Sequence, residues 1–383
     1  MEENSYLILE DGSVFPGKYF GKKPPAASQL LEEDIKKTPS GEVVFNTGMT
    51  GYHEILTDPS YKGQVIVMTY PHIGNYGTDD SWSEAGPEKP KKSKEIKASG
   101  FVVRSLYTGP VPSGRIGLND FLEKHNISGI SDVDTRKLTV KIRDGGSPRG
   151  VIIKKEKGEL TDKEIERSLS FLSEFPKMEG RNLVSDLGTK ENVVVNKEGN
   201  PHICLIDSGA KANIIRELVN LGCKVTVVSN KLQSGDISAF KPDAVLFANG
   251  PGDPAVLENL IELAKSLIGR MPVFGICLGH QIISLALGAK TFKMKFGHHG
   301  VNNPVRDEVT RAILITSQNH GFSVDEATLP ENIIVRFRNA NDKTVEGIQH
   351  KKLPVFSVQF HPEAAPGPKD AGWIFKTYLE YIG

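Results

Sequence analysis

The chain has 383 residues, 38% of them hydrophobic and 25% charged, a composition typical of soluble globular proteins. Basic and acidic residues each number 47. This balance argues against nucleic acid or an anionic membrane surface as the main partner, because both attract a basic excess. The length is about twice that of a typical domain, so we expect two domains.

The cysteines and the first residues of the sequence indicate in which cellular compartment the protein is expected. The three cysteines, Cys204, Cys223 and Cys277, are widely spaced and form no C-x-x-C pair, so the sequence predicts neither a disulfide framework nor a metal site. No apolar run reaches the roughly 18 to 20 residues that a membrane span requires. The first residues also lack the pattern of a secretory signal. We therefore expect a cytoplasmic protein.

The first half of the sequence predicts a β-rich α/β domain. It opens with an expected hairpin over residues 6–15, whose Asp11-Gly12 pair tolerates the positive φ angles of a tight turn. Further strands are expected at 43–45, 65–69, 101–103 and 151–153, and helices at 116–125 and 160–172. The polar, lysine-rich stretch 79–97 is predicted to be a loop, either simply solvated or a docking patch.

From residue 203 onward, nearly apolar strands alternate with amphipathic helices. The expected strands are 203–206, 225–228, 244–247 and 273–276, and the expected helices are 214–221, 256–268 and 279–287. This alternation is typical of a largely parallel sheet flanked by helices, in which ligands bind beyond the carboxyl ends of the strands. We predict a first domain over 1–195, with a linker from about 154, and a second over 196–383.

The segment Gly275-Ile-Cys277-Leu-Gly279 joins an expected strand to an expected helix. Glycines two residues on either side of a nucleophile are typical of a tight strand-to-helix turn where backbone segments approach closely. The turn would place Cys277 at a helix amino terminus, whose partial positive charge favours the thiolate. It would also leave the amide of Leu278 free to stabilise an oxyanion. A buried structural cysteine is the alternative.

The last apolar strand ends at His361, which is followed by Pro362 and Glu363. Pro362 favours an extended conformation for His361, and residues two apart in an extended chain point to the same side. Glu363 can then orient the imidazole, as the acid does in a catalytic triad. A pair of surface residues is the alternative for so short a motif. Four further histidines are expected to make structural hydrogen bonds instead: His280, His298, His299 and His320.

A glycine-rich loop, NGPGDP at 249–254, follows the expected strand 244–247. Such a loop before a helix can bind phosphate, but the G-x-x-x-x-G-K-[ST] pattern and its lysine are missing. A nucleotide site is therefore not expected here. Small residues at a strand end facing Cys277 fit another role, in which backbone amides hold the substrate and complete an oxyanion hole.

Longer motifs give the chain a family resemblance. GICLGHQ (275–281), the NGPGDP loop and the terminal HPE (361–363) together resemble the class I, or triad, glutamine amidotransferases. The chain is similar to the carbamoyl phosphate synthetase small-subunit family along nearly its whole length, including the amino-terminal domain that other amidotransferases lack. The motifs are FNTGMTGYHEILTDPSYKGQ (45–64), TYPHIGNYG (69–77), DVDTRKLTVKIRDGG (132–146), KMKFGHHG (293–300), SQNHGF (317–322) and HPEAAPGP (361–368).

This resemblance implies a glutaminase subunit. Cys277 is the implied nucleophile, and His361 and Glu363 complete the implied triad, which would cut L-glutamine through a γ-glutamyl thioester and release ammonia. The implied glutamine contacts are Ser60 in the first domain and Gly250, Gly252, Leu278, Gln281, Asn319, Gly321 and Phe322 in the second.

The resemblance also implies a partner. The chain would form a heterodimer with a large synthetase subunit, with higher oligomers left open. That subunit would bind ATP, Mg²⁺ and bicarbonate, while no cofactor is expected in this chain. Carbamoyl phosphate would then serve arginine synthesis, pyrimidine synthesis or both. Three rivals stay open: an amidotransferase subunit of another synthase, a non-catalytic scaffold of the same fold, and a cysteine hydrolase of peptides or γ-glutamyl conjugates.

Overall fold

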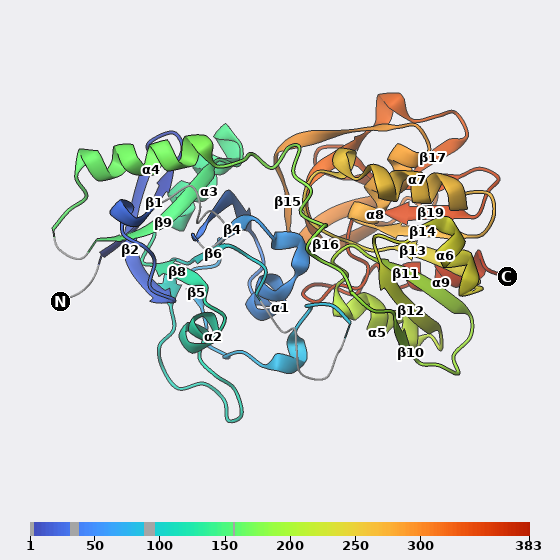
Figure 1. Ribbon diagram of the computed structural model, residues 1–383, viewed down its shortest axis with the longest axis horizontal. Helices are drawn as coiled ribbons and strands as arrows, with labels where there is room; N and C mark the ends of the chain where they lie inside the picture. Colours follow the sequence, from blue (N-terminus) through green and yellow to red (C-terminus); the bar gives the residue numbers. More distant parts are fainter. Residues whose placement is uncertain (1–3, 31–37, 88–95, 156–157) are drawn as a thin grey trace. The chain divides into compact units, whose positions relative to one another are not determined.

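The computed structural model describes residues 4–30, 38–87, 96–155 and 158–383 (Figure 1). The described chain forms two compact units, one of residues 4–83 and 96–178 and one of 84–87 and 179–383. The division near residue 178 precedes the predicted boundary at 195, and strand β10 (Val193–Val195) pairs with β12 (Lys224–Ser229) inside the second unit. The predicted loop 79–97 is shared between the two units, with the boundary after Ser83. Its residues 88–95 lie outside the described residues, so the hypothesis that the loop is a docking patch stays a prediction.

The first unit is a closed β-barrel. The strands follow one another around the ring in the order β1 (Asn4–Leu9), β2 (Val14–Gly21), β8 (Ser128–Ser131), β6 (Gly100–Val102), β4 (Gln64–Met68), β3 (Ser40–Asn46) and β9 (Arg149–Lys155), and β9 pairs with β1. A separate pair consists of β5 (His72–Ile73) and β7 (Ser105–Leu106). The predicted hairpin is confirmed, since β1 and β2 pair antiparallel and Gly12 between them has a φ of 85°.

Helices of the first unit bury one apolar side each. They are α1 (Tyr52–Thr57), α2 (Leu118–Lys124), α3 (Thr135–Gly145) and α4 (Asp162–Glu174). The predicted helices at 116–125 and 160–172 are confirmed as α2 and α4, whereas α1 and α3 were not predicted. Phe121 and Leu122 of α2 pack in one core cluster, and Phe171 of α4 packs in another with Ile8 and Ile153 of the barrel.

A mixed sheet organises the second unit. Among the described residues ten strands are joined in the order β10-β12-β11-β13-β14-β19-β18-β17-β15-β16. The further strands are β11 (His202–Asp207), β13 (Ala244–Phe247), β14 (Val273–Ile276), β15 (Lys290–Asp307), β16 (Ile313–Asp325), β17 (Ile333–Asn339), β18 (Val345–His350) and β19 (Val355–Val358). Neighbours from β12 through β19 pair parallel, and the other neighbours pair antiparallel. The predicted fold class is confirmed.

Helices cover both faces of this sheet (Figure 1). They are α5 (Ala212–Asn220), α6 (Ser234–Ala239), α7 (Glu258–Leu267), α8 (Leu278–Ala286) and α9 (Ile374–Glu380). Alternate residues of a strand point to opposite faces, so Leu205 of β11 packs in the core with α5 and α9, whereas Ile206 packs with α6, α7 and α8. Within the described residues, no helix is both long enough and apolar enough to cross a membrane.

Candidate active site

Cys277 occupies a strained turn between β14 and α8. Its φ of 53° and ψ of −104° lie where residues with side chains are rarely found. A Cβ on Gly275 would lie 2.6 Å from the carbonyl carbon of Gly279, and a Cβ on Gly279 would lie 2.0 Å from the carbonyl oxygen of Phe247. Both glycines are therefore required by the close approach of α8 to the sheet, as the sequence predicts.

The thiol of Cys277 lies beside strand β16. Its Sγ donates to the carbonyl oxygen of Asn319 at 3.6 Å, and its own amide donates to the carbonyl oxygen of Val358 at 2.9 Å. The other cysteines lie in the core, where burial raises the pKa of Cys204 to about 12 and that of Cys223 to about 11. Of the three, Cys277 is the one at the carboxyl end of a parallel strand, where ligands bind in such sheets.

His361 and Glu363 meet in the core directly after β19. The Nδ1 atom of His361 donates to Oε1 of Glu363 at 2.6 Å, and both side chains are almost completely buried. The amide of His361 donates to the carbonyl oxygen of Ser317 at 2.9 Å, which fixes the backbone beside β16. The other ring nitrogen, Nε2, is buried with no hydrogen-bond partner in the described part of the chain. The imidazole is thus anchored through Nδ1, and Cys277 is the neighbouring side chain that also favours its proton.

A buried lysine completes this network. The Nζ atom of Lys211 lies 3.1 Å from Oε1 of Glu363 and also donates to the carbonyl oxygen of Ala364. Burial opposes ionisation of Glu363, but Lys211 and His361 outweigh it and lower the pKa of Glu363 to about 2. Burial likewise opposes the imidazolium, but Glu363 and Cys277 raise the pKa of His361 to about 10. At neutral pH, Glu363 is therefore ionised and the imidazole of His361 is protonated.

Sequence reasoning missed Lys211 because lysine is rarely buried. A signal was present, since the segment from Asp207 to Lys211 follows β11 at the same edge of the sheet as Cys277. The amide of Lys211 donates to the side-chain oxygen of Asn249 at 2.9 Å.

Glu84 was also missed: burial raises its pKa to about 7, although Lys211 and Arg216 oppose the shift. Its Oε1 lies 2.8 Å from Nη1 of Arg216.

The glycine-rich loop after β13 packs against the Cys277 turn. A Cβ on Gly250 would lie 2.4 Å from the carbonyl oxygen of Ser208 and 2.8 Å from Cδ2 of Leu278. Gly252 has a φ of 94°, and a Cβ there would lie 2.7 Å from the carbonyl oxygen of Arg181. The sequence predicted that this loop lies beside the Cys277 turn, and the structure agrees. The glycines of the loop are required by close backbone contact.

Strand β16 connects to α8 through side-chain amides. The Nε2 atom of Gln281 donates to the carbonyl oxygen of Phe322 at 2.8 Å and to Oε1 of Gln359 at 2.9 Å. The Oδ1 atom of Asn319 accepts a hydrogen bond from Nδ1 of His299 at 2.9 Å. These bonds hold the β16 backbone next to Cys277 and fix the orientation of the Asn319 side chain.

Two predicted contact residues differ in setting from the rest. Gly321 lies on β16, where a Cβ would meet only the flexible end of Lys293, its Nζ at 2.9 Å. Ser60 lies in the first unit, in a short 3-10 helix (Pro59–Tyr61), with its amide donating to Oδ1 of Asp58 at 2.8 Å. The residues named above as neighbours of Cys277 belong to the second unit.

The competing histidines fall into two environments. His280 is buried, its Nδ1 lies 2.9 Å from Oγ of Ser357, and burial lowers its pKa to about 3, which fits the expected structural role. His298 differs. Burial opposes its protonation, but Asp342 and Glu346 outweigh burial and raise its pKa to about 10.

Comparisons with known proteins agree on one family. Residues 204–381 match the family model "Glutamine amidotransferase class-I", and residues 7–152 match "Carbamoyl-phosphate synthase small chain, CPSase domain". The carbamoyl phosphate synthase small chain of Methanocaldococcus jannaschii is 48% identical over 98% of this chain and 98% of that protein. That of Akkermansia muciniphila is 46% identical over 98% and 96%, and that of Chlorobaculum tepidum 44% over 98% and 97%. The chain belongs to the carbamoyl phosphate synthase small chain family, of the glutamine-hydrolysing type.

Proposed function

We propose that the chain hydrolyses L-glutamine to glutamate and ammonia with Cys277 as the nucleophile, and delivers the ammonia for carbamoyl phosphate synthesis. The observation that carries this proposal is the buried His361–Glu363 pair, whose Nδ1–Oε1 distance is 2.6 Å and whose imidazole pKa is raised in part by Cys277. The pair follows β19, which pairs in parallel with β14, the strand that leads into the strained cysteine turn.

The first chemical step forms the acyl-enzyme. The thiolate of Cys277 attacks the side-chain carbonyl carbon of glutamine, and the carbonyl oxygen becomes an oxyanion. The amide of Leu278, at the start of α8, and the amide of Gly252 stabilise this charge. His361, protonated at neutral pH, gives its proton to the departing nitrogen, so the C–N bond breaks and ammonia leaves. A γ-glutamyl thioester on Cys277 remains.

The second step reverses the roles. Neutral His361 takes a proton from a water molecule, the hydroxyl attacks the thioester carbon, and the C–S bond breaks to release glutamate and the thiolate. Glu363 keeps the proton of His361 on Nδ1 and stabilises the imidazolium each time it forms. Lys211 holds Glu363 in its charged form.

We further propose the glutamine contacts. Gly250 packs against Leu278, and Gln281 bonds to the backbone of β16, so both elements lie beside the nucleophile. The full set proposed to hold glutamine is Ser60, Gly250, Gly252, Leu278, Gln281, Asn319, Gly321 and Phe322.

The relatives are named small chains, and a small chain requires a large one. We propose that the large subunit binds ATP, Mg²⁺ and bicarbonate, because this chain carries no phosphate-binding lysine motif. Ammonia would pass within the complex, since in bulk water at neutral pH it is protonated and no longer a nucleophile. We propose that the carbamoyl phosphate formed by the complex is used in the arginine and pyrimidine pathways.

The test separates ammonia production from ammonia use. The complex with the large subunit is purified with Cys277→Ala, and carbamoyl phosphate formation is measured with glutamine and with ammonium as the nitrogen source. We expect glutamine-driven synthesis to fall by at least about 10³-fold and ammonium-driven synthesis to stay unchanged. Cys223→Ala is the matched control and should keep both activities. Retained glutamine-driven synthesis, or loss of both activities in Cys277→Ala, contradicts the proposal.

A further inference from the structure

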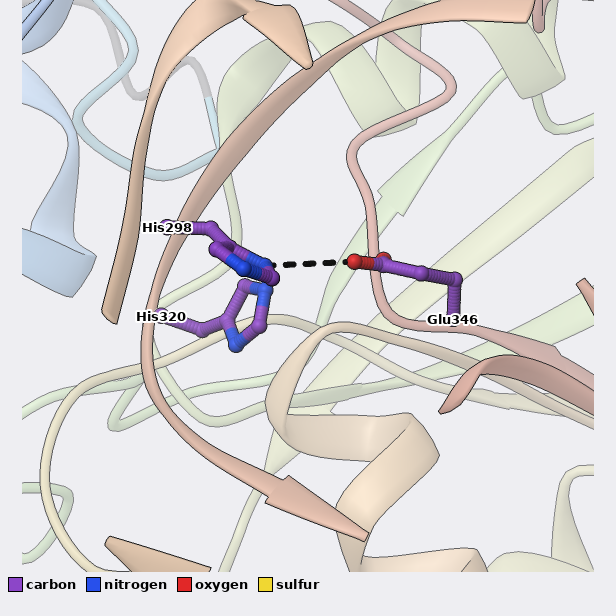
Figure 2. A group of neighbouring side chains, drawn as sticks. All are labelled: His298, His320 and Glu346. Atoms are coloured by element: carbon purple, nitrogen blue, oxygen red, sulfur yellow. Dashed lines mark ion pairs between the residues drawn. The ribbon is translucent and has the colours of Figure 1, made fainter. Parts of the chain in front are cut away.

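A second cluster of polar side chains lies buried in the same unit. His298 of β15, His320 of β16 and Glu346 of β18 each offer one nitrogen or oxygen atom, and these atoms all lie within 4.8 Å of one another. His298 and His320 are directly opposite in the β15–β16 register, with ring centroids 4.9 Å apart. Figure 2 shows the two imidazoles side by side and the carboxylate of Glu346 pointing toward them.

Both imidazoles are oriented by hydrogen bonds to neighbouring groups. The Nδ1 atom of His320 donates to the carbonyl oxygen of Phe322 at 2.8 Å, which leaves Nε2 as the acceptor of the ring, 2.9 Å from the side-chain amide of Gln318. The Nε2 atom of His298 lies 2.8 Å from Oδ2 of Asp342, and Nδ1 faces Oε1 of Glu346 at 3.2 Å. Metal-binding histidines have this arrangement, in which the other ring nitrogen donates to a carbonyl or carboxylate.

The carboxylate of Glu346 is a second indication that the cluster binds a cation. Its side chain is completely buried, Oε1 accepts from Nδ2 of Asn339 at 3.0 Å, and Oε2 has no partner among the described residues. A buried carboxylate oxygen without a partner is costly, and a cation beside it removes that cost. The side-chain amide of Gln318 lies 2.9 Å from Nε2 of His320 and would have to turn away for an ion to bind at that nitrogen.

We propose that His298, His320 and Glu346 form a binding site for a divalent transition metal ion, for which zinc is the best match. Two imidazoles and one carboxylate suit zinc and its neighbours, whereas Mg²⁺ and Ca²⁺ prefer oxygen ligands only. The ion would join β15 and β16 to β18 and so hold the strand that carries Asn319 next to Cys277. The sequence predicted no metal site, because these ligands are far apart along the chain.

The competing occupant is a proton. A protonated His298 between Asp342 and Glu346 would satisfy both carboxylates without any metal. The experiment therefore measures metal directly. The full-length chain is treated with a chelator, titrated with Zn²⁺ against a chromophoric chelator, and titrated with Co²⁺ while its visible absorption is recorded. We expect one equivalent of either ion per chain. The visible absorption bands of bound Co²⁺ should be typical of a low coordination number with nitrogen and oxygen ligands.

Variants locate the ion. Glu346→Gln should weaken binding by more than about 100-fold, and Asp342→Asn, which alters only the outer hydrogen bond, by about 10- to 100-fold. Cys277→Ala should bind normally, which excludes a thiolate site, and His202→Gln serves as a control histidine outside the cluster. Far-UV circular dichroism of each metal-free variant verifies folding, and the partly exposed Asp342 provides a test that does not disturb the core. Binding below one equivalent, or binding that survives Glu346→Gln and is lost in Cys277→Ala, overturns the proposal.

Discussion

Two buried histidines of the second unit share one electrostatic feature and differ in their surroundings. Both His361 and His298 lie in the core, where burial disfavours the imidazolium, and carboxylates outweigh burial and raise the pKa of each to about 10. His361 is anchored at Nδ1 only, and Cys277 is among the groups that favour its proton. His298 has a carboxylate beside each ring nitrogen.

The difference shows that the second ring nitrogen decides what a buried histidine can do. Nε2 of His361 faces no carboxylate, and Cys277 is among the groups that favour the proton of this ring, so Nε2 can exchange a proton with a sulfur, a leaving nitrogen or a water molecule. Each nitrogen of His298 faces a carboxylate, so this ring has no nitrogen left for a substrate, and the charge between the two acids comes from a proton on the ring or from a metal ion bound at Nδ1. A raised pKa alone therefore does not identify a catalytic histidine.

The largest expected contrast is in the rate of glutamine hydrolysis. His361→Asn removes the proposed acid and base and should lower kcat by about 10²- to 10⁴-fold. His298→Asn leaves the Cys277 network intact and should change kcat by less than about tenfold, with any larger effect on KM. Steady-state kinetics on the complex with the large subunit measure both. Equal losses of kcat in two folded variants would remove the distinction between the clusters.

The next contrast is between a glycine of the Cys277 turn and a glycine of strand β16. In Gly279→Ala the new Cβ meets the Phe247 carbonyl oxygen at 2.0 Å, so the free energy of unfolding should fall by at least about 1 to 3 kcal/mol. In Gly321→Ala the new Cβ meets only the flexible end of Lys293, and stability should change by less than about 0.5 kcal/mol. Denaturant unfolding compares the two. A Gly279→Ala protein as stable as the parent would show that the turn does not require glycine.

A third contrast is in how the free energy of unfolding depends on pH. Glu363, with a pKa lowered from 4.5 to about 2, stabilises the fold above pH 4.5 and loses this contribution as pH falls toward 2. His361, with a pKa raised from 6.5 to about 10, stabilises fully below pH 6.5 and loses its contribution as pH rises toward 10. His361→Asn should therefore flatten the alkaline loss of stability, by up to about 1.4 kcal/mol per pH unit.

Thermal unfolding between pH 6.5 and 10 checks this prediction. His280→Asn is the matched control, because burial lowers the pKa of His280 to about 3 and its charge does not change in that window. The control should keep the alkaline slope of the parent. A His361→Asn slope equal to that of the parent would mean that His361 is not charged in the folded chain.

The sequence predicted the features that are set by neighbours along the chain. The Asp11-Gly12 hairpin, the strands of the parallel sheet and the Cys277 elbow all follow from local patterns of glycine and apolar residues. The His361–Glu363 contact was predictable for the same reason, since the two residues are two apart.

Features that depend on distant contacts were not predicted. Barrel closure depends on β8 as well as on the predicted strands, and β8 is a four-residue strand with a glycine that carries no clear pattern. Helix α3 was missed because it buries few apolar residues, Leu138 and Ile142 among them, in a polar segment. Lys211 and the His298 cluster bring together residues from separate elements, and their burial contradicts the usual exposure of charged side chains.

The central claim, that Cys277 attacks the carboxamide of glutamine, can be tested by covalent capture. The complex is incubated with a glutamine analogue that carries a diazoketone in place of the carboxamide, and the modified peptide is identified by mass spectrometry. We predict a single adduct on Cys277, slowed by added glutamine and by His361→Asn, and absent from Cys277→Ala. An adduct on Cys204 or Cys223, or labelling that glutamine does not slow, would contradict the account.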